Sequence, residues 1–154
     1  MKVIFLITTA ANHKTKHNKK IMVSENLSVK DSPVHGKGLY SNIDYTEGET
    51  ITIIYGEHIN ADECVRRENE ENNVYIFYKN DDEYIDAANQ TQLRFLNHSC
   101  DYNCDIDEDE NGELVLYAVS DIKAGEELTI DYGYEEIYQY CSCMDCGNKP
   151  GQSD

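Results

Sequence analysis

The sequence predicts a mainly β protein of one domain, with several short strands and few short helices. Short runs rich in β-branched and aromatic residues recur along the chain and are separated by glycine, asparagine and aspartate, which favour turns. Only one segment combines helical length with a helix start signal. The 154 residues are 40% hydrophobic and 28% charged, which is the length and composition of one folded domain.

Six segments are expected to form strands. In chain order they are Leu27–Lys30, Thr50–Tyr55, Val74–Lys79, Glu83–Asp86, Leu114–Val119 and Leu128–Tyr132. The dipeptide Asn111-Gly112 lies between Asp105–Glu110 and Leu114–Val119. Because Asn-Gly is typical of a hairpin turn that needs positive φ, we expect these two segments to pair as an antiparallel hairpin.

One helix is expected from Ala61 to about Glu71. Asn60 can cap its N-terminus, and Glu63 follows three residues later, as a capping box requires. Shorter helical turns are expected at Gln92–Leu96 and Glu135–Tyr140.

Two segments of the chain resemble each other. Tyr45–Ile53 has the sequence YTEGETITI, and Ile122–Ile130 has the sequence IKAGEELTI. Both place a glycine turn directly before a β-rich run. Two copies are too few for a repeat array, so we interpret them as two similar turns that each lead into a strand.

The first residues differ in composition from the rest of the chain. Residues 1–23 hold five lysines and no acid. The apolar run Val3–Ile7 is too short to span a membrane, and it is also short for a secretory signal, although Lys2 and Thr9–Ala11 resemble parts of one. We expect residues 1–24 to be an N-terminal extension or a peripheral strand and linker, with no membrane association.

The charge of the remaining chain is strongly negative. The formal net charge is −17, and setting aside the five lysines of residues 1–23 leaves eight basic residues against thirty acids, a net of −22. Such a surface repels phosphate backbones, so direct nucleic-acid binding is not expected. It attracts a basic protein or peptide, especially at low salt. The alternative is that the acidity serves solubility alone.

Three of the six cysteines form a tight group, Cys141, Cys143 and Cys146. They are too crowded to pair with one another as disulfides of good geometry. Three such thiolates can form one face of a tetrahedral Zn²⁺ site, with Zn–S distances of about 2.3 Å. Cys100 and Cys104 are both available as the fourth ligand, and Cys100 is our candidate. The alternative is a secreted protein with disulfides, but the compact group favours zinc and an intracellular protein.

Five sequence blocks occur in order along the chain. They are Gly36-Lys37-Gly38-Leu39-Tyr40; Tyr75-Ile76-Phe77 with Ile85-Asp86-Ala87; Arg94-Phe95-Leu96-Asn97-His98-Ser99-Cys100; Glu127-Leu128-Thr129-Ile130-Asp131-Tyr132-Gly133-Tyr134; and the cysteine group. Together they resemble the SET-domain protein lysine methyltransferases, whose two signature blocks are R-F-x-N-H-S-C and E-L-x-x-D-Y-x-Y/F. Each block alone is weak, but five in order over about residues 25–147 make a specific match.

The resemblance implies a fold of small curved sheets in which Asn97–Cys100 and the C-terminal segment form a pseudoknot. S-adenosylmethionine would lie on one face, and a target lysine would enter a narrow channel from the other. Residues 25–134 would be the SET domain, and residues 135–154 a post-SET zinc-binding tail. The chain departs from the family at Tyr55, which lies one place from the expected channel position, and in the C-x-C-x2-C spacing of its cysteines.

The resemblance also implies a cofactor pocket. Its residues would be Gly36, Lys37, Gly38, Leu39, Tyr75, Arg94, Asn97 and His98. The glycines allow close backbone approach, and Lys37 is expected to pair with the methionyl carboxylate. Asn97 and the His98 backbone would contact the adenine edge, while Tyr75 and Arg94 complete the wall.

Tyr132 is, by the same resemblance, the catalytic tyrosine, whose hydroxyl helps to hold the transferred methyl and to orient the amine. Tyr55, Tyr117, Tyr134 and Ile130 are expected to line the substrate channel. Ile130 lies two residues before Tyr132, where some family members have Tyr or Phe. An isoleucine has no hydroxyl to hold a water, which favours di- or trimethylation.

The predicted function is an S-adenosylmethionine-dependent protein lysine methyltransferase with a structural zinc. Its expected substrate is a basic tail such as that of a histone, and its expected location is nuclear or chromatin-associated. The alternative is a catalytically weak SET module that binds a basic partner without turnover. The presence of Tyr132 and Asn97-His98 favours the enzyme.

Overall fold

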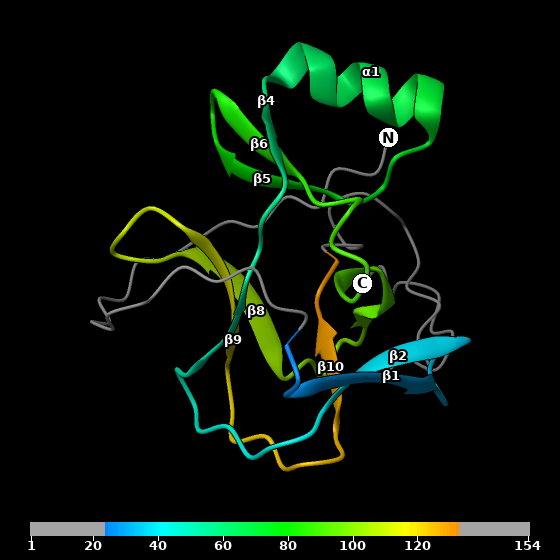
Figure 1. Cartoon of the computed structure of the whole chain (residues 1–154), viewed down its shortest axis with the longest axis vertical. Helices are drawn as coiled ribbons and strands as arrows, with labels where there is room; N and C mark the ends of the chain where they lie inside the picture. The colour runs from blue at the N-terminus through cyan, green and yellow to red at the C-terminus, as the bar shows by residue number, and fades with distance from the viewer. Residues whose placement is uncertain (1–23, 133–154) are drawn as a thin grey trace, which may run out of the picture.

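The computed structural model describes residues 24–132, and these form small β-sheets with one α-helix and a short 3-10 turn (Figure 1). The elements are β1 (Leu27–Asp31), β2 (Lys37–Ser41), β3 (Thr50–Ile53), β4 (Glu57–Ile59), α1 (Ala61–Glu71), β5 (Ile76–Asn80), β6 (Glu83–Asp86), η1 (Leu93–Phe95), β7 (Asn97–His98), β8 (Cys104–Glu108), β9 (Leu114–Ala118) and β10 (Glu127–Ile130). The prediction of a mainly β fold with few short helices is confirmed. Between residues 24 and 132, no helix is long and apolar enough to cross a membrane.

The strands form three small sheets. Their strand orders are β1-β2-β10-β7, β3-β9-β8 and β4-β6-β5. Neighbouring strands are antiparallel except β10 and β7, which run parallel, with Thr129 opposite Asn97 and Ile130 opposite His98. In Figure 1, β10 passes between the β1-β2 hairpin and the β8-β9 hairpin. The pairing of β7 with β10 supplies one half of the expected pseudoknot, and the C-terminal half lies outside the described residues.

Two parts of the chain repeat the same arrangement at a constant offset. Strands β8, β9 and β10 begin 77 residues after β1, β2 and β3, as the starting numbers 27 and 104, 37 and 114, and 50 and 127 show. Each part forms an antiparallel hairpin, β1-β2 or β8-β9. Each hairpin then pairs with the third strand of the other part, so that β10 pairs with β2 and β3 pairs with β9.

The two similar turns identified in the sequence meet at the centre of this arrangement. The backbones of Tyr45 and Ile122 exchange hydrogen bonds of 2.8 and 2.9 Å. The carboxylate of Asp44 accepts from the Ala124 N–H at 2.9 Å, and that of Asp121 accepts from the Glu47 N–H at 3.1 Å. These reciprocal contacts confirm that the two segments are equivalent turns, each leading into a strand.

Helix α1 has the bounds that the sequence predicted. The Asn60 side chain accepts a hydrogen bond from the Glu63 N–H at 2.9 Å, which caps the first turn. The Glu63 carboxylate binds Arg66 and Arg67 instead of returning to the cap, so only half of the capping box forms. The helix ends at Asn72, which takes the left-handed conformation with φ of +51° and donates its N–H to the Arg67 carbonyl.

Apolar side chains of the first two sheets share one core, to which Phe77 and Ile85 of the third sheet also belong. Its fully buried members include Leu39, Ile106, Leu116, Ile122, Leu128 and Ile130. A second, smaller cluster of Ile59, Cys64 and Ile76, with Tyr84 against it, joins α1 to the third sheet. The helix therefore has its own apolar anchor, separate from the main core.

The structure corrects several expected boundaries. Strands β2, β4 and β7 were not expected, because β2 contains a glycine and β4 and β7 are too short to show a period. The strand expected over Thr50–Tyr55 ends at Ile53, since the Tyr55 N–H leaves the sheet and donates to the Gln90 side chain. In the β8-β9 turn, Gly112 has φ of +76°, and it is the glycine of the pair, not Asn111, that takes positive φ.

Candidate active site

The first part of the site is the turn between β1 and β2. Gly36 has φ of +51°, a conformation that side chains disfavour, and a Cβ there would meet nothing within 4 Å. At Gly38 a Cβ would lie 2.1 Å from a carboxylate oxygen of Glu127, so any side chain there would require the Glu127 carboxylate to move. Leu39, next in β2, is fully buried in the main core. The backbone of this turn is thus open at Gly36 and closely packed at Gly38.

Lys37 projects outward between the two glycines. Its ammonium lies 2.7 Å from the Asp31 carboxylate, and this pair lowers the pKa of Asp31 through the hydrogen bond and the charge. Both side chains are more than half exposed. The expected pairing of Lys37 with a methionyl carboxylate stays a prediction.

Asn97 joins β7 to this turn. Its side-chain amide donates to the Lys37 carbonyl at 3.0 Å and to the Glu127 carboxylate at 2.8 Å, and it lies 3.3 Å from the His35 carbonyl. The same Glu127 carboxylate accepts from the Ser32 hydroxyl at 2.8 Å. Asn97 and the glycine turn, which are 60 residues apart in sequence, are therefore fixed to each other directly, through the Lys37 carbonyl, and through the shared Glu127 carboxylate.

His98 and Tyr132 form the next part of the site. The His98 ring is 7% exposed, and its Nδ1 accepts from the Tyr132 N–H at 3.1 Å. The two rings lie with their centroids 5.4 Å apart. The Tyr132 hydroxyl donates to the Leu96 carbonyl, directly before Asn97. The histidine side chain thus positions the tyrosine from inside the fold.

Tyr75 and Arg94 are also brought together. The Arg94 guanidinium lies over the Tyr75 ring, 4.8 Å from its centroid, as a cation–π contact. The Tyr75 backbone is fixed on both sides, since its N–H donates to the Asn73 side chain and its carbonyl accepts from the Ala87 N–H. The pair presents a flat, partly exposed face of the kind that an aromatic base can stack against.

The residues expected to line the channel lie in different parts of the fold. Tyr55 follows β3 and is 40% exposed, whereas Ile130 on β10 is 1% exposed and belongs to the main core. Tyr117 lies on β9, where burial and the nearby carboxylates of Asp105 and Asp107 raise its pKa to about 12. Tyr134 lies outside the described residues. Their shared role as a channel stays a prediction.

The two candidates for a fourth zinc ligand differ in exposure. Cys104 is fully buried in β8, and burial raises the pKa of its thiol to about 12. Cys100 is exposed and lies 3.5 Å from the His98 ring. Among residues 24–132, no group of three or more histidine, cysteine or acidic side chains could hold a metal ion. Cys141, Cys143 and Cys146 lie outside this range.

Glu127 and Ser32 are site residues that the sequence analysis did not assign. Glu127 stands in the second signature block, but no local pattern gives it a partner. Its contact with Ser32 joins positions 95 residues apart. The absence of a side chain at Gly38 was the available signal, because a glycine inside a strand indicates close approach by another group.

The glycine turn, Asn97-His98 and Tyr132 come from three separate regions of the chain and meet around β10. The SET domain family matches this chain over residues 36–133, well over half of its length. The chain therefore belongs to the SET-domain family.

Similar curated proteins are histone-lysine methyltransferases. The chain is 36% identical over 121 residues to the Mus musculus "Histone-lysine N-methyltransferase, H3 lysine-36 specific", covering 73% of this chain and 5% of that protein. It is 32% identical over 132 residues to the Emericella nidulans "Histone-lysine N-methyltransferase, H3 lysine-4 specific", covering 77% of this chain and 11% of that protein. The chain thus spans a small part of the length of these relatives.

The solved structures with a similar fold include polycomb repressive complex 2. A chain of the Chaetomium thermophilum complex superposes with a TM-score of 0.58 and 34% identity, covering 70% of this chain and 15% of that one. A second structure, ctPRC2 in an autoinhibited conformation bound to S-adenosylmethionine, gives a TM-score of 0.56 and 36% identity, with the same coverage of both chains. The SET-domain fold predicted from the sequence blocks is confirmed.

Proposed function

We propose that this chain is an S-adenosylmethionine-dependent protein lysine methyltransferase. The observation that carries the proposal is the convergence of Gly36–Gly38, Asn97-His98 and Tyr132, held by hydrogen bonds between distant parts of the chain. Histone-lysine methyltransferases are among its relatives, and one structure of similar fold binds S-adenosylmethionine. A shared family and these fixed contacts together favour the same chemistry here.

The residues present fit a bound S-adenosylmethionine. The open backbone at Gly36 offers polar groups, and the Tyr75–Arg94 face offers a stacking surface. In this proposal Gly36, Gly38, Asn97 and His98 hold the cofactor, with Lys37 and Leu39 beside them. The cofactor supplies an electrophilic methyl group on a positively charged sulfur.

The chain's own part in the reaction concerns the lysine amine. A lysine has a reference pKa near 10.4, so at pH 7 only about one in 2,500 amines is unprotonated. Burial away from water and a nearby positive charge both favour the neutral amine. Tyr132 is fixed by His98 and Leu96, so its hydroxyl is positioned in advance to orient that amine.

A histone tail is the substrate class that we propose. The chain has a formal net charge of −17, which attracts a cationic peptide and repels nucleic acid. The names of the relatives specify lysines of histone H3. A nuclear or chromatin-associated location follows from such a substrate.

The test is methyl transfer from labelled S-adenosylmethionine to core histones by the purified chain. We expect saturable cofactor binding and label on lysine, identified by mass spectrometry. If the chain does not bind the cofactor, the proposal is wrong. Binding without transfer to any histone would favour the alternative, a catalytically weak module that holds a basic partner.

Zinc is part of the same proposal. An exposed Cys100 can join Cys141, Cys143 and Cys146 around one Zn²⁺, whereas the buried thiol of Cys104, with its raised pKa, is a poor ligand. Residues 135–154 would then be a post-SET tail held against the SET domain of residues 25–134, after an extension of residues 1–24. We expect one zinc per chain and alkylation of Cys100 only after chelation. Rapid alkylation of Cys100 in a chain that keeps its zinc would contradict this ligand set.

A further inference from the structure

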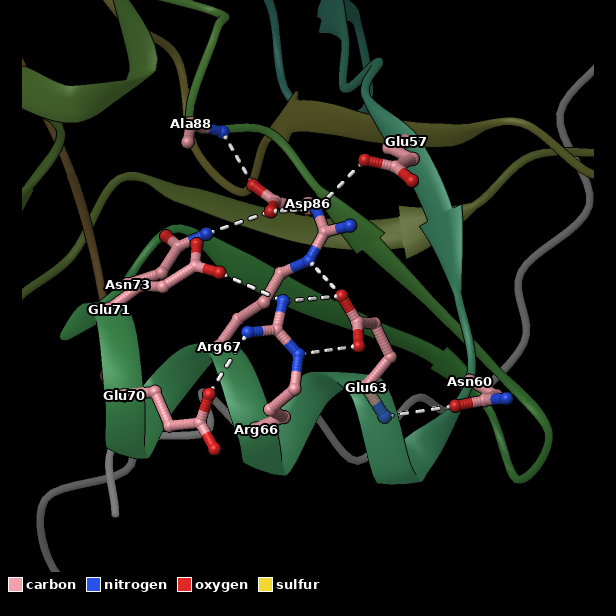
Figure 2. Close-up of polar contacts among 10 residues, drawn as sticks. All are labelled: Glu57, Asn60, Glu63, Arg66, Arg67, Glu70, Glu71, Asn73, Asp86 and Ala88. Atoms are coloured by element: carbon pink, nitrogen blue, oxygen red, sulfur yellow. Dashed lines mark hydrogen bonds and ion pairs between the residues drawn. The ribbon is translucent and has the colours of Figure 1, made fainter.

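Two neighbouring arginines of helix α1 make different kinds of contact. Among the residues that the structure describes, Arg66 pairs with three carboxylates, at 2.8 to 3.2 Å, and all of them belong to α1 itself: Glu63, Glu70 and Glu71. Arg67 also pairs with three carboxylates, but two of them lie on strands of the third sheet, as Figure 2 shows. Arg67 is therefore a contact between the helix and the sheet, whereas Arg66 acts within the helix.

The partners of Arg67 on the sheet are Glu57 of β4, at 2.8 Å, and Asp86 of β6, at 2.6 Å. The Arg67 side chain is 15% exposed and the Asp86 side chain is 8% exposed, so this pair is largely shielded from water. A charge in such a place is costly unless it is paired. Loss of Arg67 would leave the Asp86 carboxylate buried without its cationic partner.

Asp86 has further contacts that fix its position. Its carboxylate accepts from the Asn73 side chain at 2.8 Å and from the Ala88 N–H at 3.0 Å. Burial raises the pKa of Asp86, but the hydrogen bonds from Arg67, Asn73 and Ala88 outweigh it, and the pKa is lowered. A Cβ on Gly56 would lie 2.0 Å from the Asp86 carbonyl oxygen, so the chain after β3 packs directly against this residue.

One path from Asp86 leads to the cofactor side of the site. Asn73 donates to Asp86 and accepts from the Tyr75 N–H at 3.0 Å, while Ala87, next to Asp86, donates its N–H to the Tyr75 carbonyl at 2.9 Å. The Tyr75 ring then carries Arg94 on its face. The position of the Tyr75–Arg94 face thus depends on the segment that Asp86 anchors.

A second path leads to Tyr55. The Gln90 N–H donates to the Ala87 carbonyl at 2.8 Å. The Gln90 side chain accepts from the Tyr55 N–H at 3.0 Å and donates to the Ile53 carbonyl at 2.9 Å. The same short segment, Asp86–Gln90, therefore also holds the backbone of Tyr55, a proposed channel residue.

We propose that Arg67 is a positioning residue, which through Asp86 sets the placement of both the Tyr75–Arg94 face and Tyr55. This inference rests on the proposed function, since it assigns these two groups to the cofactor pocket and the peptide channel. It makes helix α1 a support for the site, although no residue of the helix contacts the reacting atoms in this account. Arg67 then acts on binding of both substrates more than on the chemical step.

Arg67→Ala and Arg66→Ala form a matched pair for the test. Both arginines lie on helix α1, and each change removes a side chain that pairs with three carboxylates. Arg67→Ala is expected to raise the dissociation constant for S-adenosylmethionine and the KM for a histone peptide by about tenfold each, with a smaller change in kcat. Arg66→Ala is expected to leave both constants within about twofold. Circular dichroism at the assay temperature shows that each variant is folded.

Asp86→Asn is the second variant, because it keeps the shape of the side chain. It is expected to weaken cofactor binding as Arg67→Ala does. Because the two residues act as a pair, the double variant Arg67→Ala/Asp86→Asn should bind S-adenosylmethionine as tightly as the weaker-binding of the two single variants. Arg67→Lys, which keeps a cation near Asp86, should recover part of the affinity. Equal effects of Arg66→Ala and Arg67→Ala, or strictly additive effects of Arg67→Ala and Asp86→Asn, would overturn the inference. An inactive wild-type chain that binds no cofactor would instead refute the proposed function.

Discussion

The two repeated parts of the fold share two hydrogen bonds in their hairpin turns. In the first, the Ser32 N–H donates to the Gly36 carbonyl, and the Ser32 side chain accepts from the Val34 N–H. In the second, 77 residues later, the Asp109 N–H donates to the Glu113 carbonyl, and the Asp109 side chain accepts from the Asn111 N–H. The same two hydrogen bonds are therefore made twice, once with a serine and once with an aspartate as the side-chain acceptor, although positive φ falls at Gly36 in the first turn and at Gly112, the equivalent of His35, in the second.

The two parts differ where the site is formed. The position equivalent to Gly38 holds Val115 in the second part, and the position equivalent to Glu127 holds Thr50 in the first. The sheet of the first hairpin also has one more strand, β7, which brings Asn97 to the turn. The repeated backbone supplies the frame, and a few unmatched residues supply the chemistry.

Gly38→Ala should have the largest effect. The added Cβ would lie 2.1 Å from the Glu127 carboxylate, so Glu127 must move and Asn97 loses its charged acceptor. Overpacking and the lost hydrogen bond together are expected to weaken cofactor binding by about a hundredfold. Isothermal titration with S-adenosylmethionine measures this. Val115→Ala, at the equivalent place, should change stability but leave the affinity within about twofold.

Glu127→Gln should have a smaller effect of the same kind. Gln keeps the size of the side chain but removes the charge that binds Asn97 and Ser32, and the difference between a charged and a neutral acceptor corresponds to about tenfold in affinity. Glu126→Gln is the control, since within residues 24–132 the adjacent Glu126 side chain accepts a hydrogen bond from its own turn alone, from the Lys123 N–H. Equal affinities for the two variants would show that Asn97 is not held through Glu127.

The contact between helix α1 and the third sheet should weaken at low pH and lower the stability of the fold. The hydrogen bonds from Arg66 and then Arg67 lower the pKa of Glu63 to about 2, and the pKa of Asp86 is also lowered. The unfolded chain therefore binds more protons as pH falls from about 4.5 to about 2, and stability is lost over this range. Urea midpoints at pH 5 and pH 3 should differ less in Arg67→Ala than in the wild type. An unchanged difference would exclude Arg67 as the cause.

Asn60→Ala should have the smallest effect. It removes the cap of α1 and is expected to lower the free energy of unfolding by about 1 kcal/mol. Asn69→Ala, at an exposed position within the same helix, should instead raise it by a few tenths of a kcal/mol, because alanine favours the helix. Thermal unfolding compares the two variants. The two changes in the free energy of unfolding should have opposite signs. A loss of stability in both variants would contradict the assignment of Asn60 as the cap.

Local signals in the sequence predicted the local features of the fold. The cap and length of α1 set its bounds, and the likeness of Tyr45–Ile53 to Ile122–Ile130 indicated two equivalent turns. The glycine in β2 and the two-residue length of β7 hid these strands, although both carry site residues. A strand of two or three residues is too short to show an alternating pattern. Such strands form because of their pairing with neighbouring strands, which the local sequence does not reveal.

Contacts between distant residues were not predictable. The family blocks placed Asn97, His98 and Tyr132 in one site, but Glu127 and Arg67 were given no role. Ser32 and Glu127 are 95 residues apart, and Arg67 and Asp86 are joined across a helix and a strand. Such pairings depend on strand order and helix placement, which composition and spacing do not encode.

The most direct test of the central claim separates transfer from cofactor binding at Tyr132. Phenylalanine keeps the ring beside His98 and removes only the hydroxyl that we assign to the reaction. For Tyr132→Phe we expect methyl transfer to histone to fall by at least about a hundredfold, while the dissociation constant for S-adenosylmethionine stays within about threefold of the wild-type value. Transfer at the wild-type rate would contradict the account.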